Sequence, residues 1–361
     1  MSQQKMLAEI KEKVMQGERL GYEEGLFLIR EADLLALGEM AAEIKRRKTG
    51  KKVFFNVNRH INITNVCVSR CKFCAFGRDK DAAGAYTMSL DEIMECGREA
   101  LEQGATELHI VSGLHPDLPF SFYVEVLAQL KKAYPSLHLQ AFTAVEIDYF
   151  SRISGLSVKE VLAALKEAGL GSMPGGGAEI FSSRIRSALC PNKASAERWL
   201  EVMRTAHSLG IKSNATMLYG HIETFEERIE HLLKLRELQD ETGGFQSFVP
   251  LRFHPENTEL SEVSPTTAVE DLKVLAVSRL MLDNFDHIKA FWIMLGIPVA
   301  QISLAFGVDD LDGTVVEEKI THAAGATTEK GISKDTLIRL IKEAGYLPVE
   351  RDTVYNIIQE Y

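Results

Sequence analysis

Three of the five cysteines in this 361-residue chain lie close together in the sequence. Cys67, Cys71 and Cys74 form the pattern Cys-x3-Cys-x2-Cys, which directly follows a predicted strand. Thiolates this close in an apolar loop repel one another unless a metal compensates their charge. The spacing therefore predicts a metal site in this loop.

Two kinds of metal centre remain open at this point. Structural zinc takes four ligands, so zinc would need a distant histidine in addition to the three cysteines. A cubic iron-sulfur cluster normally takes four cysteines; with three, one iron stays open to a substrate or cosubstrate. Cys96 on a predicted outer helix and Cys190 before Pro191 are interpreted as small buried side chains.

From residue 51 onward, short strand-like runs alternate with longer amphipathic runs. This alternation predicts an α/β fold of parallel strands with right-handed crossovers, and a count of eight strands favours closure into a (βα)8 TIM-type barrel. The predicted strands are 60–66, 107–111, 137–142, 171–173, 212–218, 245–249, 287–292 and 301–305. The predicted helices between them are 89–102, 120–133, 158–168, 194–209, 224–240 and 266–283.

The barrel is expected to carry an extension at each end. Apolar residues at helical spacing predict an N-terminal helical extension over 1–50, followed by the barrel over 51–322 and a C-terminal helical extension over 323–361. The basic run at 46–52 is interpreted as a solvated boundary. The cysteine loop then lies at the carboxyl end of the first barrel strand, where sites of such barrels are built.

Charge and composition exclude several classes of partner. Lys and Arg total 41 against 51 Asp and Glu, so the net charge of -10 gives no positive field to attract nucleic acid or a membrane surface. The N-terminus shows no secretory signal, and the apolar run at 290–308 is interrupted by polar residues, proline and glycine. We expect a cytoplasmic protein with reduced thiols and a small-molecule substrate.

With Phe73 directly before its last cysteine, the loop resembles the signature of radical S-adenosylmethionine (SAM) enzymes. The resemblance implies a 4Fe-4S cluster held by Cys67, Cys71 and Cys74, whose open iron chelates the amino and carboxylate groups of SAM. In that superfamily an electron from the cluster cleaves SAM to methionine and a 5′-deoxyadenosyl radical. A flavodoxin or ferredoxin is the reductant that this chemistry implies.

The resemblance also implies contacts to SAM. Ser112 and Gly113, with His115 close behind, lie where the superfamily has a Gly-rich segment that contacts the methionine amino group, although many relatives have glycine in place of Ser112. Glu179 follows a Pro-Gly-Gly-Gly turn and could accept hydrogen bonds from ribose hydroxyls. Arg198 could pair with the methionine carboxylate, or equally form a surface ion pair with a neighbouring glutamate.

Longer segments resemble the aminofutalosine synthase family of the futalosine route to menaquinone. They are 58–62, 67–74, 114–119, 142–147, 174–179, 214–221 and 253–257, and the similarity runs from about residue 50 to 325. The family reaction adds the adenosyl radical to 3-[(1-carboxyvinyl)oxy]benzoate. Rearrangement and decarboxylation then give 6-amino-6-deoxyfutalosine, methionine and bicarbonate, so SAM is a cosubstrate that the reaction consumes.

The implied substrate carries two carboxylates, so its pocket needs cationic or multiple-donor partners near the strand ends. The candidates for substrate contacts, chosen by their positions in or near the predicted strands and on a late helix, are Arg59, His60, Asn214, Thr216, His221, Arg252, His254 and Arg279. Gln301, Asp309 and Asp310 could line the same mouth.

Three alternative functions remain. The related cyclase later in the same pathway and the hydroxybenzyl-transferring enzymes of deazaflavin cofactor synthesis have a similar cluster loop. The sequences around His115, Glu179 and His254 favour aminofutalosine synthase over both. A zinc-stabilised barrel that only binds a small molecule is the alternative from a different class.

Overall fold

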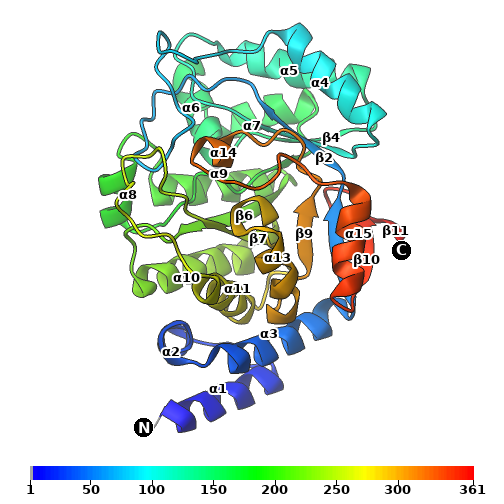
Figure 1. Cartoon of the computed structure of the whole chain (residues 1–361). Helices are drawn as coiled ribbons and strands as arrows, with labels where there is room; N and C mark the ends of the chain where they lie inside the picture. Colours follow the sequence, from blue (N-terminus) through cyan, green and yellow to red (C-terminus); the bar gives the residue numbers. More distant parts are fainter. Residues whose placement is uncertain (1–2) are drawn as a thin grey trace.

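A barrel of parallel strands with helices around it forms the centre of the computed structural model, which describes residues 3–361 (Figure 1). Neighbouring strands pair in chain order, and every one of these pairs is parallel. The strands are β2 (Asn58–Asn62), β3 (Glu107–Val111), β4 (His138–Ala141), β5 (Ser172–Met173), β6 (Lys212–Tyr219), β7 (Phe245–Arg252) and β8 (His287–Ile288). The predicted barrel is confirmed.

The barrel is closed by β9 (Asp310–Gly313) and the residues that follow it. The Ala290 N–H donates to the Asp310 carbonyl at 2.9 Å, and the His60 N–H donates to the Val316 carbonyl at 3.0 Å. This stretch of chain therefore bridges the gap between β8 and β2. It also pairs in parallel with β1 (Lys52–Asn56), the strand directly before β2.

The predicted strand at 301–305 is wrong. These residues form the end of α13 (Ile297–Ser303) and the short 3-10 helix η1 (Leu304–Phe306). Pro298 in the first turn favours a helix, and Gly307 ends the turn in the left-handed region with φ 90°. The real closing strand has the sequence Asp-Leu-Asp-Gly, which strand propensity disfavours, so hydropathy alone did not reveal it.

Capping boxes begin four of the helices that cover the barrel. Ser89, Thr143, Ser157 and Thr224 each accept from the backbone three residues later, while the glutamate at that position accepts from the cap residue. The predicted helices correspond to α4 (Leu90–Glu102), α5 (Phe120–Ala133), α7 (Val158–Glu167), α9 (Ala196–Ser208), α10 (Phe225–Thr242) and α11 (Ala268–Met281). The sequence prediction missed α6 (Ala144–Ser154), α8 (Ser183–Leu189), α12 (Trp292–Leu295) and α14 (Ile320–Ala323).

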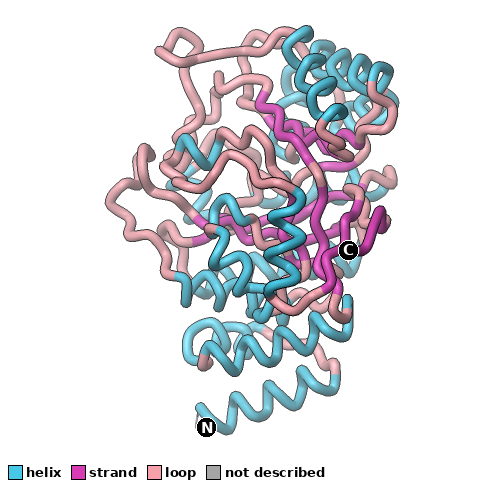
Figure 2. The backbone as a smooth tube through the Cα atoms, turned by 45° about the vertical axis from the view of Figure 1, so that its right-hand side comes forward, coloured by secondary structure: helices cyan, strands magenta, loops and turns pink. Residues whose placement is uncertain are grey.

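The N-terminal segment is helical and packs against one end of the barrel. Its helices are α1 (Gln3–Gln16), α2 (Tyr22–Glu31) and α3 (Leu34–Thr49), which lie in layers below α10 and α11 (Figures 1 and 2). Leu37 and Met40 of α3 are fully buried, and Arg19 pairs with Asp240 at 2.6 Å and Asp283 at 2.8 Å. Apolar burial and these ion pairs hold the segment against the barrel helices.

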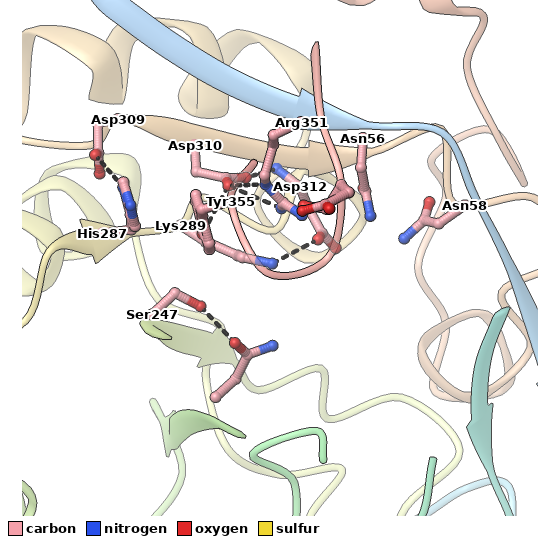
Figure 3. Close-up of polar contacts among 12 residues, drawn as sticks. Asn56, Asn58, Ser247, His287, Lys289, Asp309, Asp310, Asp312, Arg351 and Tyr355 are labelled. Atoms are coloured by element: carbon pink, nitrogen blue, oxygen red, sulfur yellow. Dashed lines mark hydrogen bonds and ion pairs between the residues drawn. The ribbon is translucent and has the colours of Figure 1, made fainter. Parts of the chain in front are cut away.

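The C-terminal segment contains strands as well as the predicted helix. After α15 (Lys334–Glu343), β10 (Leu347–Arg351) pairs in parallel with β1, and β11 (Ile357–Glu360) pairs antiparallel with β10. Arg351 is fully buried, with its Nε 2.9 Å from Asp310 Oδ2, and the Tyr355 hydroxyl donates to the same oxygen at 2.8 Å (Figure 3). The end of the chain is thereby tied to the strand that closes the barrel.

Within residues 3–361, no helix has both the length and the apolar character that a membrane span requires.

Replacing Arg351 with Leu is expected to lower the free energy of unfolding by about 3–5 kcal/mol, because the buried Asp310 carboxylate loses its cation. Urea denaturation monitored by circular dichroism measures this change. The control is Arg339→Ala, which removes a largely exposed pair with Glu343 and should cost about 0.5 kcal/mol or less. Equal effects of the two substitutions would contradict a structural role of the buried pair.

Candidate active site

A cavity of about 350 Å³ opens at the carboxyl ends of the barrel strands. The cysteine loop lines it together with side chains of β2, β3, β4, β6 and β7, so residues far apart in the sequence share one space. The predicted site residues that line it are Cys67, Cys71, Phe73, Cys74, Ser112, Gly113, Glu179, His60, Asn214, Thr216, Arg252 and His254.

The backbone fixes the shape of the cysteine loop. The Cys67 N–H donates to the Arg78 carbonyl at 3.0 Å, and the Gly77 N–H donates to the Cys74 sulfur at 3.4 Å. The Cys74 N–H donates to the Cys71 carbonyl at 3.0 Å, which forms a turn between the last two cysteines. Backbone hydrogen bonds therefore shape the loop around the three cysteines, all of which line the cavity.

The donor set fits an iron-sulfur cluster. Burial raises the pKa of the Cys71 thiol to about 12 in spite of the nearby Lys193, so its thiolate needs a further cation. Cys67, Cys71 and Cys74 all line this one cavity. A cluster can take each of the three cysteines on a different iron atom, whereas a structural zinc ion needs a fourth protein ligand.

The segment after β3 passes very close to the cysteine loop. The Gly113 N–H donates to the Thr64 carbonyl at 2.8 Å, and a Cβ on Gly113 would lie 2.4 Å from the Val66 carbonyl oxygen. The Ser112 N–H donates to Glu146 Oε1 at 2.9 Å. Position 113 requires glycine, because only a residue without a side chain permits this close approach to the Val66 carbonyl.

Glu146 is a cavity residue that sequence reasoning missed. Its other oxygen accepts from the backbone N–H and the hydroxyl of Thr143, at 2.7 and 2.8 Å. Burial raises its pKa to about 7, although these donors act in the opposite direction. Glu146 caps α6 and ties that helix to the backbone of Ser112 at the wall of the cavity.

The Gly-rich turn after β5 also lines the cavity, on the side of the cysteine loop. A Cβ on Gly175 would lie 2.7 Å from the backbone of Ala215, and the Thr216 hydroxyl donates to the Gly175 carbonyl at 2.7 Å. Glu179 adopts a left-handed φ of 48° and accepts a hydrogen bond from the buried Lys193. The turn thus packs directly on β6 and places a carboxylate in the cavity.

Two predicted SAM contacts lie outside the cavity lining. Arg198 pairs with Asp148 at 2.8 Å and with Glu201 at 3.0 Å, as the ion-pair alternative expects, and its contact with the methionine carboxylate stays a prediction. His115 Nδ1 accepts from the Asp117 N–H at 3.1 Å. It acts in the turn after β3 and does not line the cavity.

Three predicted substrate contacts also lie elsewhere. Arg59 alternates with His60 along β2, so its side chain points to the opposite face and pairs with Glu99 on α4 at 2.7 Å. Arg279 is fully buried behind the barrel wall, 2.5 Å from Asp309.

His221 is the third of these predicted substrate contacts. Its side chain is fully buried, and its Nδ1 lies 2.8 Å from Glu223 Oε2.

The residues predicted to line the mouth of the cavity form contacts with other parts of the protein instead. Gln301 donates to the Leu340 carbonyl at 2.9 Å, Asp309 pairs with Arg279, and Asp310 pairs with Arg351.

Sequence reasoning missed several polar residues that line the cavity. His109 and Gln140 are register partners of His60 across β2, β3 and β4, so strand alternation could have identified them. Lys289 and Asp312 lie at β8 and β9, where the predicted strand boundaries were wrong. Lys193 and Glu318 come from loops that carried no signal.

Comparison with known proteins finds two family matches. Residues 61–235 match the Radical SAM superfamily, and residues 242–360 match the CofH/MqnC C-terminal region. The chain is 49% identical to the aminodeoxyfutalosine synthase of Thermus thermophilus, over 98% of this chain and 96% of that one. It is 41% identical to the 5-amino-6-(D-ribitylamino)uracil--L-tyrosine 4-hydroxyphenyl transferase of Methanopyrus kandleri, over 89% of this chain and 88% of that one.

A solved structure shares the fold. The crystal structure of methylornithine synthase matches with a TM-score of 0.75 at 18% identity, over 94% of this chain and 97% of that chain.

Gly113→Ala is expected to destabilise the fold by about 1–3 kcal/mol, because its Cβ forces the backbone at Val66 away. It should also lower the iron bound after anaerobic reconstitution, since Cys67 follows Val66 directly. Chemical denaturation and iron analysis measure the two effects. Gly21→Ala, whose Cβ would meet only the flexible Glu24 carboxylate at 3.6 Å, is the control and should retain its iron. Full iron content in Gly113→Ala would contradict the expected coupling.

Proposed function

The chain belongs to the radical SAM superfamily, among relatives that include the aminodeoxyfutalosine synthases, and we propose that it adds the 5′-deoxyadenosyl radical to 3-[(1-carboxyvinyl)oxy]benzoate. The proposed products, after rearrangement and decarboxylation, are 6-amino-6-deoxyfutalosine, methionine and bicarbonate. This is a radical SAM enzyme of the futalosine route to menaquinone.

The observation that carries the proposal is the near full-length similarity to enzymes of that name. Identity is 49% to the Thermus enzyme and 41% to the tyrosine 4-hydroxyphenyl transferase. The similarity extends beyond the cysteine loop into the second half of the chain, where the barrel wall contributes the residues that would face the substrate. It therefore supports the reaction as well as the cofactor.

We assign the cofactors to one side of the cavity. Cys67, Cys71 and Cys74 would hold three irons of the 4Fe-4S cluster, and SAM would lie beside the Gly113 and Gly175 backbones, which line the same cavity. When bound, cluster and SAM supply a 5′-deoxyadenosyl radical.

Neighbouring side chains on this side have positioning roles in the proposal. Glu179 would accept from the ribose hydroxyls while Lys193 holds its carboxylate in place. The Lys193 ammonium also lies over the Phe73 ring, 5.1 Å from its centre, which keeps that ring beside the last cysteine.

The other wall would bind the substrate. Arg252 Nη2 donates to the Thr266 carbonyl at 2.9 Å, and its guanidinium lies 3.6 Å from Asp271, which leaves donors for a carboxylate in the cavity. Thr216 and His254 line the same wall. The barrel encloses the reacting groups, so the residues of both walls exclude water and competing hydrogen donors from the radical.

The electron donor is proposed to be a flavodoxin or ferredoxin, because cluster chemistry of this kind needs a low-potential one-electron carrier. The cytoplasm is the proposed compartment, where five cysteines stay reduced. The net charge of -10 supports a small molecule, and neither nucleic acid nor a membrane, as the partner.

The function is tested by an anaerobic assay of reconstituted, reduced protein with SAM and the enolpyruvyl benzoate. We expect methionine and a product with the mass of the adenosyl adduct less one carboxyl group, read by mass spectrometry. Formation of 5′-deoxyadenosine without an adduct would contradict the proposed substrate and leave the radical chemistry in place.

Cys71→Ala is expected to abolish both cluster assembly and product formation, because one iron loses its ligand. Iron and sulfide content and electron paramagnetic resonance of the reduced protein measure the cluster. Cys96→Ala is the matched control, since Cys96 lies on α4 outside the cavity lining and should leave the cluster intact. A Cys71→Ala protein that is active without a cluster would contradict the assignment of the metal ligands.

A further inference from the structure

Lys289, directly after β8, is a buried cation in the cavity that no sequence motif marked. Its side chain lines the cavity, and its ammonium lies 3.2 Å from Asp312 Oδ1 (Figure 3). Among the residues that the structure describes, this is its only hydrogen bond. An ammonium has three N–H donors, so two remain for a ligand.

Asp312 is held rigidly and stays charged. Its backbone adopts a left-handed φ of 64°, and its N–H donates to Asp310 Oδ1 at 2.6 Å. Asp310 is in turn fixed by Arg351 of the C-terminal strand. Burial acts to raise the Asp312 pKa, but Lys289 and Arg351 outweigh it and hold that pKa below its usual value. The carboxylate therefore keeps the Lys289 ammonium extended into the cavity.

Two further side chains offer donors at this depth of the barrel. The Ser247 hydroxyl donates to Asn214 Oδ1 at 2.8 Å, which leaves the Asn214 amide NH2 free to face the cavity. His60 lines the cavity, is 8% exposed, and its Nε2 is buried without a partner among the described residues. We call His60, Asn214, Lys289 and Asp312 the polar floor.

Strand register brings part of the polar floor to one level. Asn214 pairs with Ser247, and Ser247 pairs with His287, two residues before Lys289. His60 and Asn214 lie within their strands, so the polar floor is deeper than the cysteine loop, which follows the end of β2. A ligand that reaches the polar floor therefore extends away from the cysteines.

Flat rings lie beside the polar floor. The His60 ring stacks on His109 with centroids 4.5 Å apart, and it lies parallel to Phe291 at 6.5 Å. Val249 and Leu251 of β7 add apolar surface to the same cavity. Parallel rings next to a cation favour a planar ligand that ends in an anion, which describes an aromatic carboxylate.

The other cavity cations have neighbours of their own. Lys193 is bound by Glu179 next to Cys71, on the side assigned to SAM. Arg252 is anchored by the Thr266 carbonyl, near Asp271. Arg252 keeps further donors, but it lies at the end of β7, so Lys289 is the cation of the polar floor itself.

We propose that Lys289 recognises the ring carboxylate of the aromatic substrate, with the Asn214 amide and the His60 Nε2–H as additional donors and Asp312 as the positioning residue. This assignment rests on the proposed function, because it takes the benzoate ring of that substrate as the ligand. The polar floor then selects a carboxylated ring and orients the enol ether toward the cysteine side of the cavity.

The test separates binding from turnover. Reconstituted holoenzyme with SAM is titrated calorimetrically, under anaerobic conditions, with the enolpyruvyl benzoate and with 2-phenoxyacrylate, which lacks the ring carboxylate. We expect Lys289→Met to weaken binding of the benzoate by about 30-fold or more, as for removal of one partner of a buried charge pair. Binding of 2-phenoxyacrylate should change by less than about 3-fold. The variant therefore loses the preference of the protein for the ligand that carries the ring carboxylate.

Controls separate recognition from a general structural effect. Lys289→Arg should retain most of the preference, and SAM affinity and iron content should not change. Lys45→Met removes a buried lysine outside the cavity and should leave the preference intact. Asn214→Ala, which keeps the lysine, is expected to reduce the preference by about 5-fold, and it serves as the test if Lys289→Met does not fold.

The outcomes are distinct. Wild-type protein that binds both ligands equally, or a folded Lys289→Met variant that keeps the preference, overturns the role of Lys289. Product formation is measured on the same samples. A Lys289-dependent preference without adenosyl adduct would support the recognition site and refute the proposed function. Formation of the adenosyl adduct without a Lys289-dependent preference would support the proposed function and refute the recognition site.

Discussion

Compensation of buried cysteine charge is the constraint on which this structure depends. A thiol such as Cys71 does not ionise in its cavity without a strong cation, because burial favours the neutral form. Backbone hydrogen bonds hold this loop in shape, and one of them, from the Gly77 N–H, is accepted by the Cys74 sulfur. The close approach of Gly113 to the same loop extends this rigidity to the neighbouring strand end.

The barrel converts this local arrangement into a cavity with two unlike sides. Glycine turns after β3 and β5 permit close backbone approach on the cysteine side. On the other side, β6, β7 and β8 present amide, guanidinium and ammonium donors, each held by a partner. A radical generated on one side meets a ligand positioned from the other, which is the arrangement that bond formation between two bound molecules requires.

The C-terminal strands belong to the functional architecture. Arg351 enters from β10 and fixes Asp310, whose other oxygen accepts the Asp312 N–H, and Asp312 holds Lys289. Such a chain of buried charges is costly to leave incomplete, so the end of the polypeptide supports the cavity through the strand that closes the barrel. The match of residues 242–360 to one family region is consistent with their folding as part of the site.

The sequence by itself determined the cysteine pattern, the glycine turns and most of the barrel, because these features depend on local spacing and on alternating hydropathy. β3 and α5, for example, have the predicted bounds. Only the tertiary structure decided which polar side chains face the cavity. Arg59 and His60 are adjacent, yet one pairs with an outer helix while the other lines the barrel. Arg279 is locked behind the wall by Asp309, whereas Lys289, which no local pattern marked, reaches the interior. The direction of a long cation depends on a partner supplied from a distant strand, and strand pairing sets that partner.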